Sequence, residues 1–517
     1  MCGKWIALLG LLGLAAQAGV AEEAPPIVYT VRVPAPGTHT AEVEILLPTG
    51  GRPAVELMMA VWTPGFYRVE DYAEGVKALT ARSVDGARLT VEAPRKNRWR
   101  IETGGRPVIV VAYRLLCDQR SVTTNWIGDD LAVLNGAAAF PTPVGQAHSP
   151  HEIRIELPAQ WKRSITALPP APDGLANHYL AADFDTLADS PIVAGNPAVH
   201  EFTVDDSVHV LVDLGASGSW NGDKAANELA KMVRATRRFW GFLPFRRYLF
   251  LNVFRPGGGG LEHRDSTLLT AQAPADNGQP TLRWLAFVTH EYFHAFNVKR
   301  LRPAELGPFD YEQPAKTSSL WVSEGLTTYY GQLLVVRAGL ADGSSFLAWL
   351  SGEIDKLQSS PGRRKQTLEA ASLDVWNSHL SGVDQTTPTT VSYYVKGPIV
   401  GFLLDAEIQR ATQGRKCLDD VMRLAYSRFA GEHGFTPEQF RGLVEELAGP
   451  GLRDWLQSTL ASTEELDYDK ALDWLGLRFV PAKEASKAWT LAARADASEE
   501  QRQHLRDLFT GEQPTDN

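Results

Sequence analysis

Short apolar runs that alternate with polar residues dominate the chain from about residue 26 to residue 212. They include "IVYTVRV", "TAEVEIL", "AVELMMAVW", "HEIRIELP" and "VHVLVDL", and Gly, Pro and Asp turns separate them. Alternation with a period of two is typical of strands that bury one face, and β-branched residues favour the same structure. The pattern predicts an all-β domain over residues 22–215, an antiparallel sandwich or saddle.

The pattern changes after residue 215. "DKAANELAKMVRATRRFWGF" has the spacing of an amphipathic helix, "YLFLNVF" is typical of a strand, and helical segments follow from Leu282 onward. We predict an α/β domain over residues 216–345, a helical part over 346–480 that completes it, and a short helical and polar tail over 481–517. The chain is therefore predicted to be multidomain, which its length of 517 residues also favours.

One helix start can be predicted residue by residue in "FTPEQF". Thr436 is the expected N-cap, Pro437 the first helical residue, and Gln439 the residue that completes a capping box. Phe435 and Phe440 are placed to form a hydrophobic staple across the cap.

The first 21 residues have the features of a secretory signal peptide. Lys4 precedes an apolar run from Trp5 to Ala16, and cleavage fits after Ala18 or Ala21. An uncleaved anchor is the alternative, although the apolar run is short for a span. Cys2 lies ahead of the run, which argues against lipidation. We expect an exported protein, periplasmic or secreted, with no stable membrane insertion after cleavage.

Charge and cysteine content narrow the possibilities further. The formal net charge is −10, so no basic footprint indicates a nucleic-acid partner. Only Cys117 and Cys417 remain after cleavage, and two distant cysteines do not make a disulfide framework. We expect core thiols, with a single pairing as the alternative.

The stretch "VTHEYFHAFNVKR" carries the strongest chemical signal. Residues four apart stack on one face of a helix, so His290 and His294 would direct their imidazoles to one point. This is the spacing of two zinc ligands, and Glu291 between them fits a general base that takes a proton from water. Satisfied structural histidines are the alternative, but burying both beside an acid without a cation would be costly.

A catalytic zinc needs a third protein ligand and one open position. Glu324 in "LWVSEGLTTYYGQLL" is the best candidate because it lies in a helical pattern, which holds a ligand more rigidly than a loop does. Glu305, Asp310 and Glu312 lie nearer in sequence but in the Pro-rich "LRPAELGPFDYEQP". One Zn²⁺ per chain at such a site predicts metal-assisted hydrolysis.

Two further motifs are candidates for substrate contacts. In "FRPGGGGLEHRDSTLLT", Gly259 and Gly260 permit close approach of another chain, and "LEHRDSTLL" is predicted as an edge strand for an extended peptide. Glu262 would then clasp a protonated α-amine. A flexible turn with a solvated glutamate is the alternative.

In "VSYYVKGPIVGFLLD" we predict a helix that begins near Pro398. A hydroxyl from Tyr393 or Tyr394 just before it could stabilise the oxyanion that forms when water adds to a carbonyl. An aromatic pair packed in the core is the alternative.

Together these motifs resemble the glycyl aminopeptidase family of zinc metallopeptidases, gluzincins with a thermolysin-like catalytic domain. The matching pieces are "GGGGLEHRDS", "HEYFHAFNVKRLRP", "GPFDYE", "LWVSEGLTTYY" and "SYYVKG", while "WTPGFYRVEDYA" and "FDTLADSPIVAG" resemble its N-terminal β domain. The resemblance implies release of small N-terminal residues such as Gly or Ala from peptides. For the site it implies His290, His294 and Glu324 as zinc ligands and Glu291 as base. By a looser analogy with larger aminopeptidases, "GGLEH" occupies the place of their amine-binding motif, which implies Glu262 at the amine. "YVKG" occupies the place of their tyrosine motif, which favours Tyr394 over Tyr393 at the oxyanion.

The resemblance has one departure. Family members commonly continue into a PDZ domain after a segment like "ELDYDKALDWLGLRF", and the residues that follow it here do not have that texture. We therefore expect no complete PDZ module in this sequence. A zinc endopeptidase of the same fold, and a non-catalytic peptide-binding protein with a structural zinc, are the rival expectations for function.

Overall fold

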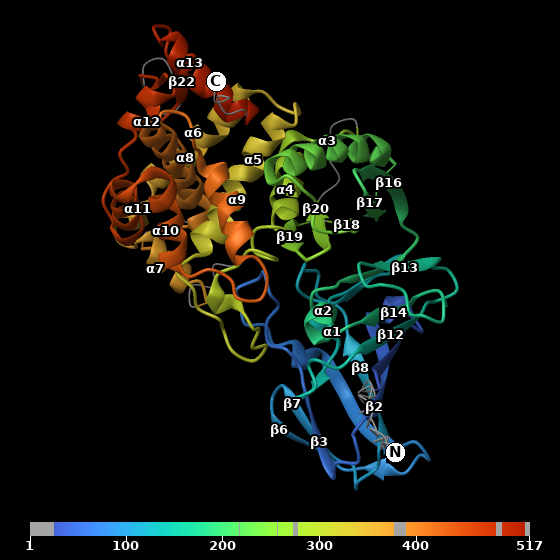
Figure 1. Ribbon diagram of the computed structural model, residues 1–517. Helices are drawn as coiled ribbons and strands as arrows, with labels where there is room; N and C mark the ends of the chain where they lie inside the picture. Colours follow the sequence, from blue (N-terminus) through green and yellow to red (C-terminus); the bar gives the residue numbers. More distant parts are fainter. Residues whose placement is uncertain are drawn as a thin grey trace, which may run out of the picture.

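The computed structural model describes residues 25–511, apart from 217, 256, 272–277, 377–388 and 482–488. The predicted signal peptide lies outside these residues. Figure 1 shows two parts: a β-rich part from the first half of the chain, and a part in which many helices lie beside a smaller sheet. This division confirms the predicted fold class.

Three sheets build the N-terminal part. They are a seven-stranded sheet, β14 (His178–Ala181), β12 (His151–Glu156), β1 (Ile27–Arg32), β2 (Thr40–Pro48), β8 (Val108–Leu116), β4 (Val76–Ser83) and β5 (Arg88–Leu89); a four-stranded sheet, β13 (Arg163–Thr166), β15 (Ile192–Gly195), β10 (Leu131–Leu134) and β9 (Trp126–Ile127); and a second four-stranded sheet, β11 (Thr142–Pro143), β3 (Ala54–Met58), β7 (Arg98–Glu102) and β6 (Val91–Arg95). Two short helices, α1 (Gly136–Ala139) and α2 (Phe184–Ala188), and the turns η1 (Pro36–Thr38) and η2 (Tyr72–Gly75) connect them.

The alternation that predicted these strands is the alternation of burial. Along β2, every second side chain of "TAEVEILLP" is buried, because successive side chains of a strand point to opposite faces. The pairing is not wholly antiparallel, however, because β1 and β12 run parallel. Two parallel neighbours far apart in sequence leave no local signal that distinguishes them from antiparallel ones.

The second part, which we call the catalytic part because it carries the predicted zinc ligands, contains a five-stranded sheet. Its strand order is β16 (Ala198–Val204), β17 (Ser207–Leu214), β18 (Arg247–Phe254), β20 (Ser266–Ala271) and β19 (Gly259–Glu262). Its first two strands precede residue 215, where the sequence predicted the end of the N-terminal domain. They join this sheet because β17 pairs in parallel with β18 along its whole length. The catalytic part therefore begins near residue 198.

Helices cover this sheet and extend beyond it (Figure 1). They are α3 (Gly222–Trp240), α4 (Leu282–Phe293), η4 (Trp321–Leu326), α5 (Thr327–Arg337), α6 (Gly343–Ser359), α7 (Leu368–Leu373), α8 (Tyr393–Thr412), α9 (Leu418–Phe429), α10 (Pro437–Ala448), α11 (Pro450–Ala461), α12 (Asp469–Trp474) and α13 (Glu499–Thr510), with the turns η3 (Ala304–Leu306) and η5 (Pro361–Arg364). In the tail, β21 (Leu477–Phe479) pairs with β22 (Leu491–Ala493) across residue 480, so the tail is joined to the helical part.

The predicted start of α10 is confirmed. Thr436 accepts from the Gln439 amide, the Gln439 side chain accepts from the Thr436 amide, and Pro437 is the first helical residue. The rings of Phe435 and Phe440 lie 5.6 Å apart, as the staple requires.

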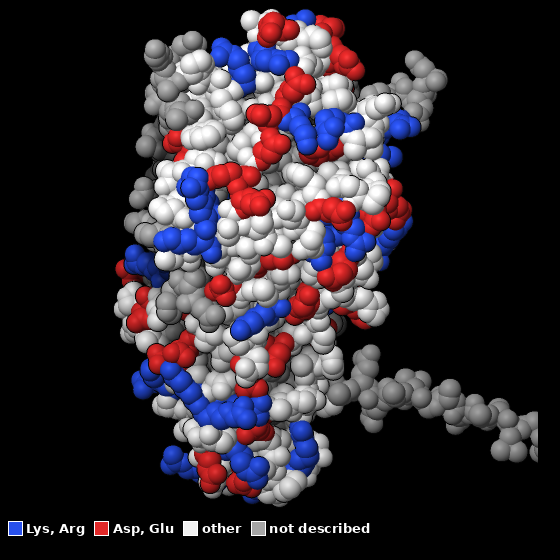
Figure 2. All heavy atoms as spheres, turned by 90° about the vertical axis from the view of Figure 1, so that its left-hand side faces the viewer, with Lys and Arg blue, Asp and Glu red and all other residues white. Residues whose placement is uncertain are grey.

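Two expectations about the whole molecule can be compared with the structure. Within the described residues Cys117 and Cys417 are not joined to each other; Cys117 is buried, whereas Cys417 is half-buried at the N-cap of α9. Within the described ranges, no helix combines the length and apolarity that a bilayer crossing requires. Lys and Arg are interspersed with Asp and Glu on the face seen in Figure 2.

Candidate metal centre and active site

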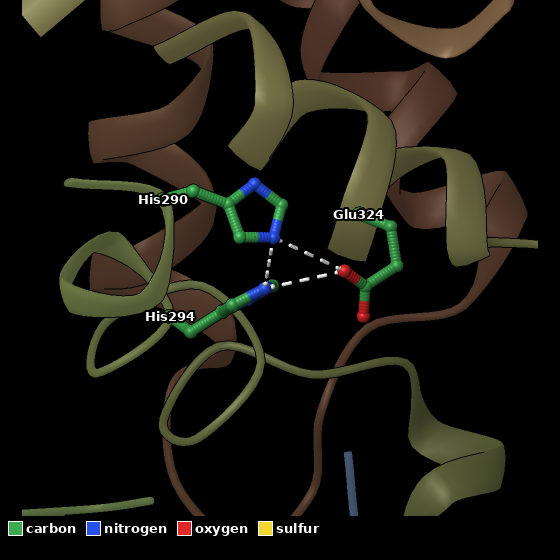
Figure 3. Close-up of side chains that lie close together, drawn as sticks. All are labelled: His290, His294 and Glu324. Atoms are coloured by element: carbon green, nitrogen blue, oxygen red, sulfur yellow. Dashed lines mark hydrogen bonds and ion pairs between the residues drawn. The ribbon is translucent and has the colours of Figure 1, made fainter. Parts of the chain in front are cut away.

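Two histidines from the end of α4 converge on one point. The Thr281 side chain caps the start of the helix, His290 lies in its last turn, and His294 follows directly after its last residue. The Nε2 atoms of His290 and His294 lie 3.0 Å apart (Figure 3). The four-residue spacing therefore brings both rings to one face, as predicted.

Glu324 reaches the same point from η4, which is a π-helical turn leading into α5. Its Oε2 lies 3.2 Å from His294 Nε2 and 3.6 Å from His290 Nε2 (Figure 3). These three residues form the one group of His, Cys, Asp or Glu side chains in the described chain whose ligand atoms all approach within 4.8 Å. A single π turn within helical structure often marks a functional site.

The open side of the cluster is the side of His290. The side chain of His290 is 15% exposed, whereas those of His294 and Glu324 are 1% and 2% exposed. A substrate or water would therefore reach a bound cation beside His290, and the protein closes the other sides.

Contacts at Nδ1, the ring nitrogen that faces away from the cluster, fix the orientation of both histidine rings. The Asn297 carbonyl accepts a hydrogen bond from His294 Nδ1 at 2.9 Å, and Thr328 Oγ1 lies 3.3 Å from His290 Nδ1. Because a carbonyl can only accept, His294 Nδ1 carries a proton and Nε2 faces the cluster. Such bonds at the far nitrogen of a histidine ring keep the metal-binding nitrogen directed at its ion.

Asn297 also joins the two elements that carry the cluster, and the sequence analysis missed it. Its side-chain amide donates to the Val322 carbonyl at 2.8 Å and to Thr327 Oγ1 at 2.9 Å. These acceptors lie on either side of Glu324, so one buried side chain ties the end of the histidine helix to the glutamate turn. The only signal in the sequence was its position three residues after His294.

Electrostatics favour a cation at this point. Burial alone would lower the pKa of His294, but the charges of Glu324, Glu262 and Glu291 overcome it and raise that pKa to about 10. Burial would raise the pKa of Glu324, but His294 and His290 hold it well below its ordinary value. The negative charges of three carboxylates thus act on the His294 imidazole. The ring nitrogens of His290 and His294 and the carboxylate of Glu324 are donors that fit a divalent cation with nitrogen and oxygen ligands.

Glu291 and Gly260 lie against each other beside the cluster. Glu291 is 5% exposed, and a side chain at position 260 would collide with its carboxylate. Burial, together with Glu262 and Glu324, raises the pKa of Glu291 against the effect of His294. Gly260 lies in β19, so the edge strand passes directly over the predicted base. A Cβ added at Gly259 would meet only Val122 and Thr270, at ordinary van der Waals distances.

Glu262 ends this edge strand and is buried, at 3% exposure. Burial raises its pKa, and its Oε1 has no hydrogen-bond partner among the described residues. The predicted single strand "LEHRDSTLL" is wrong, because a turn at residues 263–265 divides it into β19 and β20. The edge therefore belongs to the glycine-rich strand.

Tyr394 and Tyr393 lie at the start of α8. The Tyr394 ring lies 6.2 Å from that of His290, and the Tyr393 ring, 4.8 Å from Tyr394, is buried in the core. The helix begins at Tyr393, not near Pro398 as predicted, because the Ser392 side chain caps it by accepting from the Tyr394 amide.

A glycine pair sets the spacing between α8 and the Glu324 turn. A Cβ added at Gly325 would lie 2.7 Å from the Gly397 Cα, and the reverse contact is equally close. The two backbones can approach only because neither residue has a side chain. This contact brings Tyr394 and Glu324 to the same centre.

The rival acids lie elsewhere. Glu312 bonds Asn97 and Arg98 of the N-terminal part, and Tyr311 beside it donates to Asp185 Oδ1 at 2.8 Å. The Asp310 carbonyl accepts from Trp62 Nε1. The loop "GPFDYE" is therefore a contact between the two parts of the molecule.

The fold and the His-His-Glu site define a zinc metallopeptidase. Residues 28–196 match the M61 peptidase N-terminal domain, and residues 283–400 match the M61 glycyl aminopeptidase domain. Together these ranges cover more than half of the sequence, and the chain belongs to the M61 glycyl aminopeptidase family. A comparison with curated proteins gives no match.

Solved structures show the same fold. An aminopeptidase N family protein from Idiomarina loihiensis is similar with a TM-score of 0.82 at 25% identity, over 88% of this chain and 80% of that one. An M1 zinc metallopeptidase from Deinococcus radiodurans gives 0.54 at 13% identity, over 86% and 95%. A mutant of that enzyme bound to its Tyr-Ser-Ala substrate gives 0.54 at 14% identity, with the same coverage.

Replacing Asn297 by Ala keeps the backbone carbonyl that accepts from His294 but removes the amide that ties the Glu324 turn to the end of α4. We expect zinc affinity to weaken about 10-fold, the lower end of the cost of losing a residue that orients a metal ligand. Competition with a chromophoric chelator measures this. Asn125→Ala is the matched control, because Asn125 is also buried and its side chain bonds Ala138 and Asn135 within the N-terminal part. If both variants lose thermal stability and neither loses zinc affinity, the Asn297 side chain has no role at the metal.

Proposed function

We propose that the protein is a zinc-dependent aminopeptidase that hydrolyses the N-terminal bond of peptides and releases small residues such as Gly or Ala. The observation that carries the proposal is the buried carboxylate of Glu262 beside the His-His-Glu cluster; one oxygen of this carboxylate has no hydrogen-bond partner in the part of the chain that the structure describes. Burying an unpaired carboxylate is costly, and a protonated α-amine would supply the missing positive charge and donors.

The edge strand gives the substrate a direction. An extended peptide that lies along β19 passes Gly260, which lies against Glu291, before it reaches Glu262, because Glu262 is the last residue of the strand. With the amine at Glu262, the first peptide bond lies near Glu291. This order supports removal of one residue at a time from the N-terminus.

His290, His294 and Glu324 would hold the zinc, which supplies a Lewis acid that polarises the carbonyl and acidifies water. Glu291 removes the proton of the attacking water and later delivers it to the leaving amine. Burial raises the pKa of Glu291, which favours its holding the proton between these two steps. Tyr394 donates a hydrogen bond to the oxyanion as it forms.

Replacing Tyr394 by Phe is expected to lower kcat about 10²- to 10³-fold, the cost of losing one oxyanion donor. Tyr393→Phe is the matched control, because it removes the hydroxyl of a neighbouring tyrosine whose ring is packed in the core. We expect the control to retain most of its kcat on a glycyl dipeptide amide. Equal losses in the two variants would contradict the assignment of Tyr394.

The rival endopeptidase activity is tested by blocking the amine. Free Gly-Ala amide is expected to be cleaved with chelator-sensitive kinetics, whereas N-acetyl-Gly-Ala amide is not. Glu262→Gln should lower kcat/KM for the free peptide, and a panel of free-amine dipeptide amides would rank the first residue. Equal cleavage of the acetylated peptide would overturn the aminopeptidase proposal in favour of an endopeptidase.

A further inference from the structure

A loop of the N-terminal part, Trp62–Tyr67, reaches the wall of the active site. Gly65 at its apex has a φ of +101°, and any side chain there would collide with the Glu262 carboxylate. The Pro64 carbonyl accepts from Lys299 Nζ at 3.3 Å, five residues beyond His294. The apex of the loop is thereby held against the residue that the proposed function places at the substrate amine.

The side chain of Tyr67 packs outside the core of its own domain. It is 6% exposed and packs within the core of the catalytic part, whose other buried members come from Val204 onward. Its ring lies edge-on to Trp376 at 6.1 Å. Tyr311 makes the reverse exchange, because it comes from the catalytic part and is buried in the N-terminal core. The two parts therefore interlock through one tyrosine from each.

The Tyr67 hydroxyl is buried and has no hydrogen-bond partner among the described residues. Leaving a buried hydroxyl unpaired is unfavourable. At the wall of the site, where Gly65 of the same loop packs against Glu262, a substrate donor would relieve that cost. Burial raises the pKa of Tyr67, and the charges of Glu324 and Glu262 raise it further. The phenol thus lies within electrostatic range of both the metal cluster and Glu262.

We propose that Tyr67 is a substrate-binding residue whose hydroxyl oxygen accepts a hydrogen bond from the α-amine of the peptide, beside Glu262. This proposal rests on the proposed aminopeptidase function. A protonated amine has several donors, and Glu262 Oε1 and the Tyr67 hydroxyl are both buried without partners among the described residues. Gly65, two residues before Tyr67, packs against the Glu262 carboxylate. The N-terminal domain then completes the amine site, which the catalytic part does not form alone.

Tyr67→Phe removes the hydroxyl and keeps the ring packed against Trp376. We expect kcat/KM for Gly-Ala amide to fall about 10- to 100-fold, the range for losing a hydrogen bond to a charged group, with zinc content unchanged. In a Glu291→Gln background, the Kd for Gly-Ala measured by calorimetry should weaken by a similar factor. Tyr72→Phe is the matched control, because the Tyr72 hydroxyl is also buried without a hydrogen-bond partner among the described residues, but the Tyr72 side chain packs in the N-terminal core. It should keep wild-type values.

Unchanged kcat/KM and Kd in Tyr67→Phe, in an enzyme that still requires a free amine, would overturn the role of Tyr67 and leave the proposed function intact. Equal losses in Tyr67→Phe and Tyr72→Phe would also overturn it. Failure of the proposed function has a different signature, because the wild type would then cleave acetylated and free peptides alike. In that case the Kd comparison still decides whether Tyr67 binds the amine.

Discussion

Glu291→Gln is expected to abolish hydrolysis while the protein keeps its zinc. The substitution preserves the volume of a side chain that fits against Gly260, but an amide cannot take a proton from water. General-base catalysis contributes about 10²- to 10⁴-fold, so kcat should fall by that factor. Initial rates on Gly-Ala amide, with zinc measured in the same sample, test this.

Glu407→Gln is a suitable control for this substitution. Glu407 is also buried, at 8% exposure, but it pairs with Arg410 on α8. It should keep wild-type kcat. If Glu291→Gln retains full activity, Glu291 is not the base. Wild-type protein that contains zinc and hydrolyses none of the peptides would instead support a binding protein with a structural zinc.

Glu324→Gln is expected to have the second large effect, on the metal itself. The carboxylate is the anionic member of the cluster, and its buried Oε2 approaches both imidazoles. Loss of a residue that only hydrogen-bonds a metal ligand typically weakens metal affinity about 10- to 100-fold. Removing a direct ligand should weaken zinc binding by more than that. Zinc content after dialysis against a weak chelator should fall from one per chain to a small fraction, and activity should fall with it.

Glu305→Gln provides the comparison for that result. Glu305 was a rival ligand on sequence grounds, but its carboxylate accepts from Thr317 in the loop. Its substitution should leave zinc content and activity unchanged. Loss of zinc in Glu305→Gln with retention in Glu324→Gln would contradict the proposed ligand set.

The sequence predicted the parts of the site that depend on local spacing. His290 and His294 converge because a helix places residues four apart on one face, and the cap of α10 depends on four neighbouring residues. Glu324 was predicted as the third zinc ligand because it lies in a helical pattern, and a helix holds a ligand rigidly. The π turn that presents it was not foreseen, since its geometry depends on packing against Asn297 and Gly397.

What the sequence could not predict depends on contacts between distant segments. The β texture runs unbroken through residue 214, so nothing local shows that β17 pairs with β18. Pro398 suggested a helix start, but the Ser392 cap begins the helix five residues earlier. Gly65 and Tyr67 lie about 200 residues before Glu262 and Glu291, in a domain where no catalytic motif is visible.

The central claim is that His290, His294 and Glu324 hold one zinc ion. Anomalous scattering at the zinc edge from crystals of the untreated protein tests it most directly. The account predicts one strong peak per chain, about 2.0–2.2 Å from the Nε2 atoms of both histidines and from a carboxylate oxygen of Glu324. A peak away from these atoms, or no zinc signal from active enzyme, would contradict it.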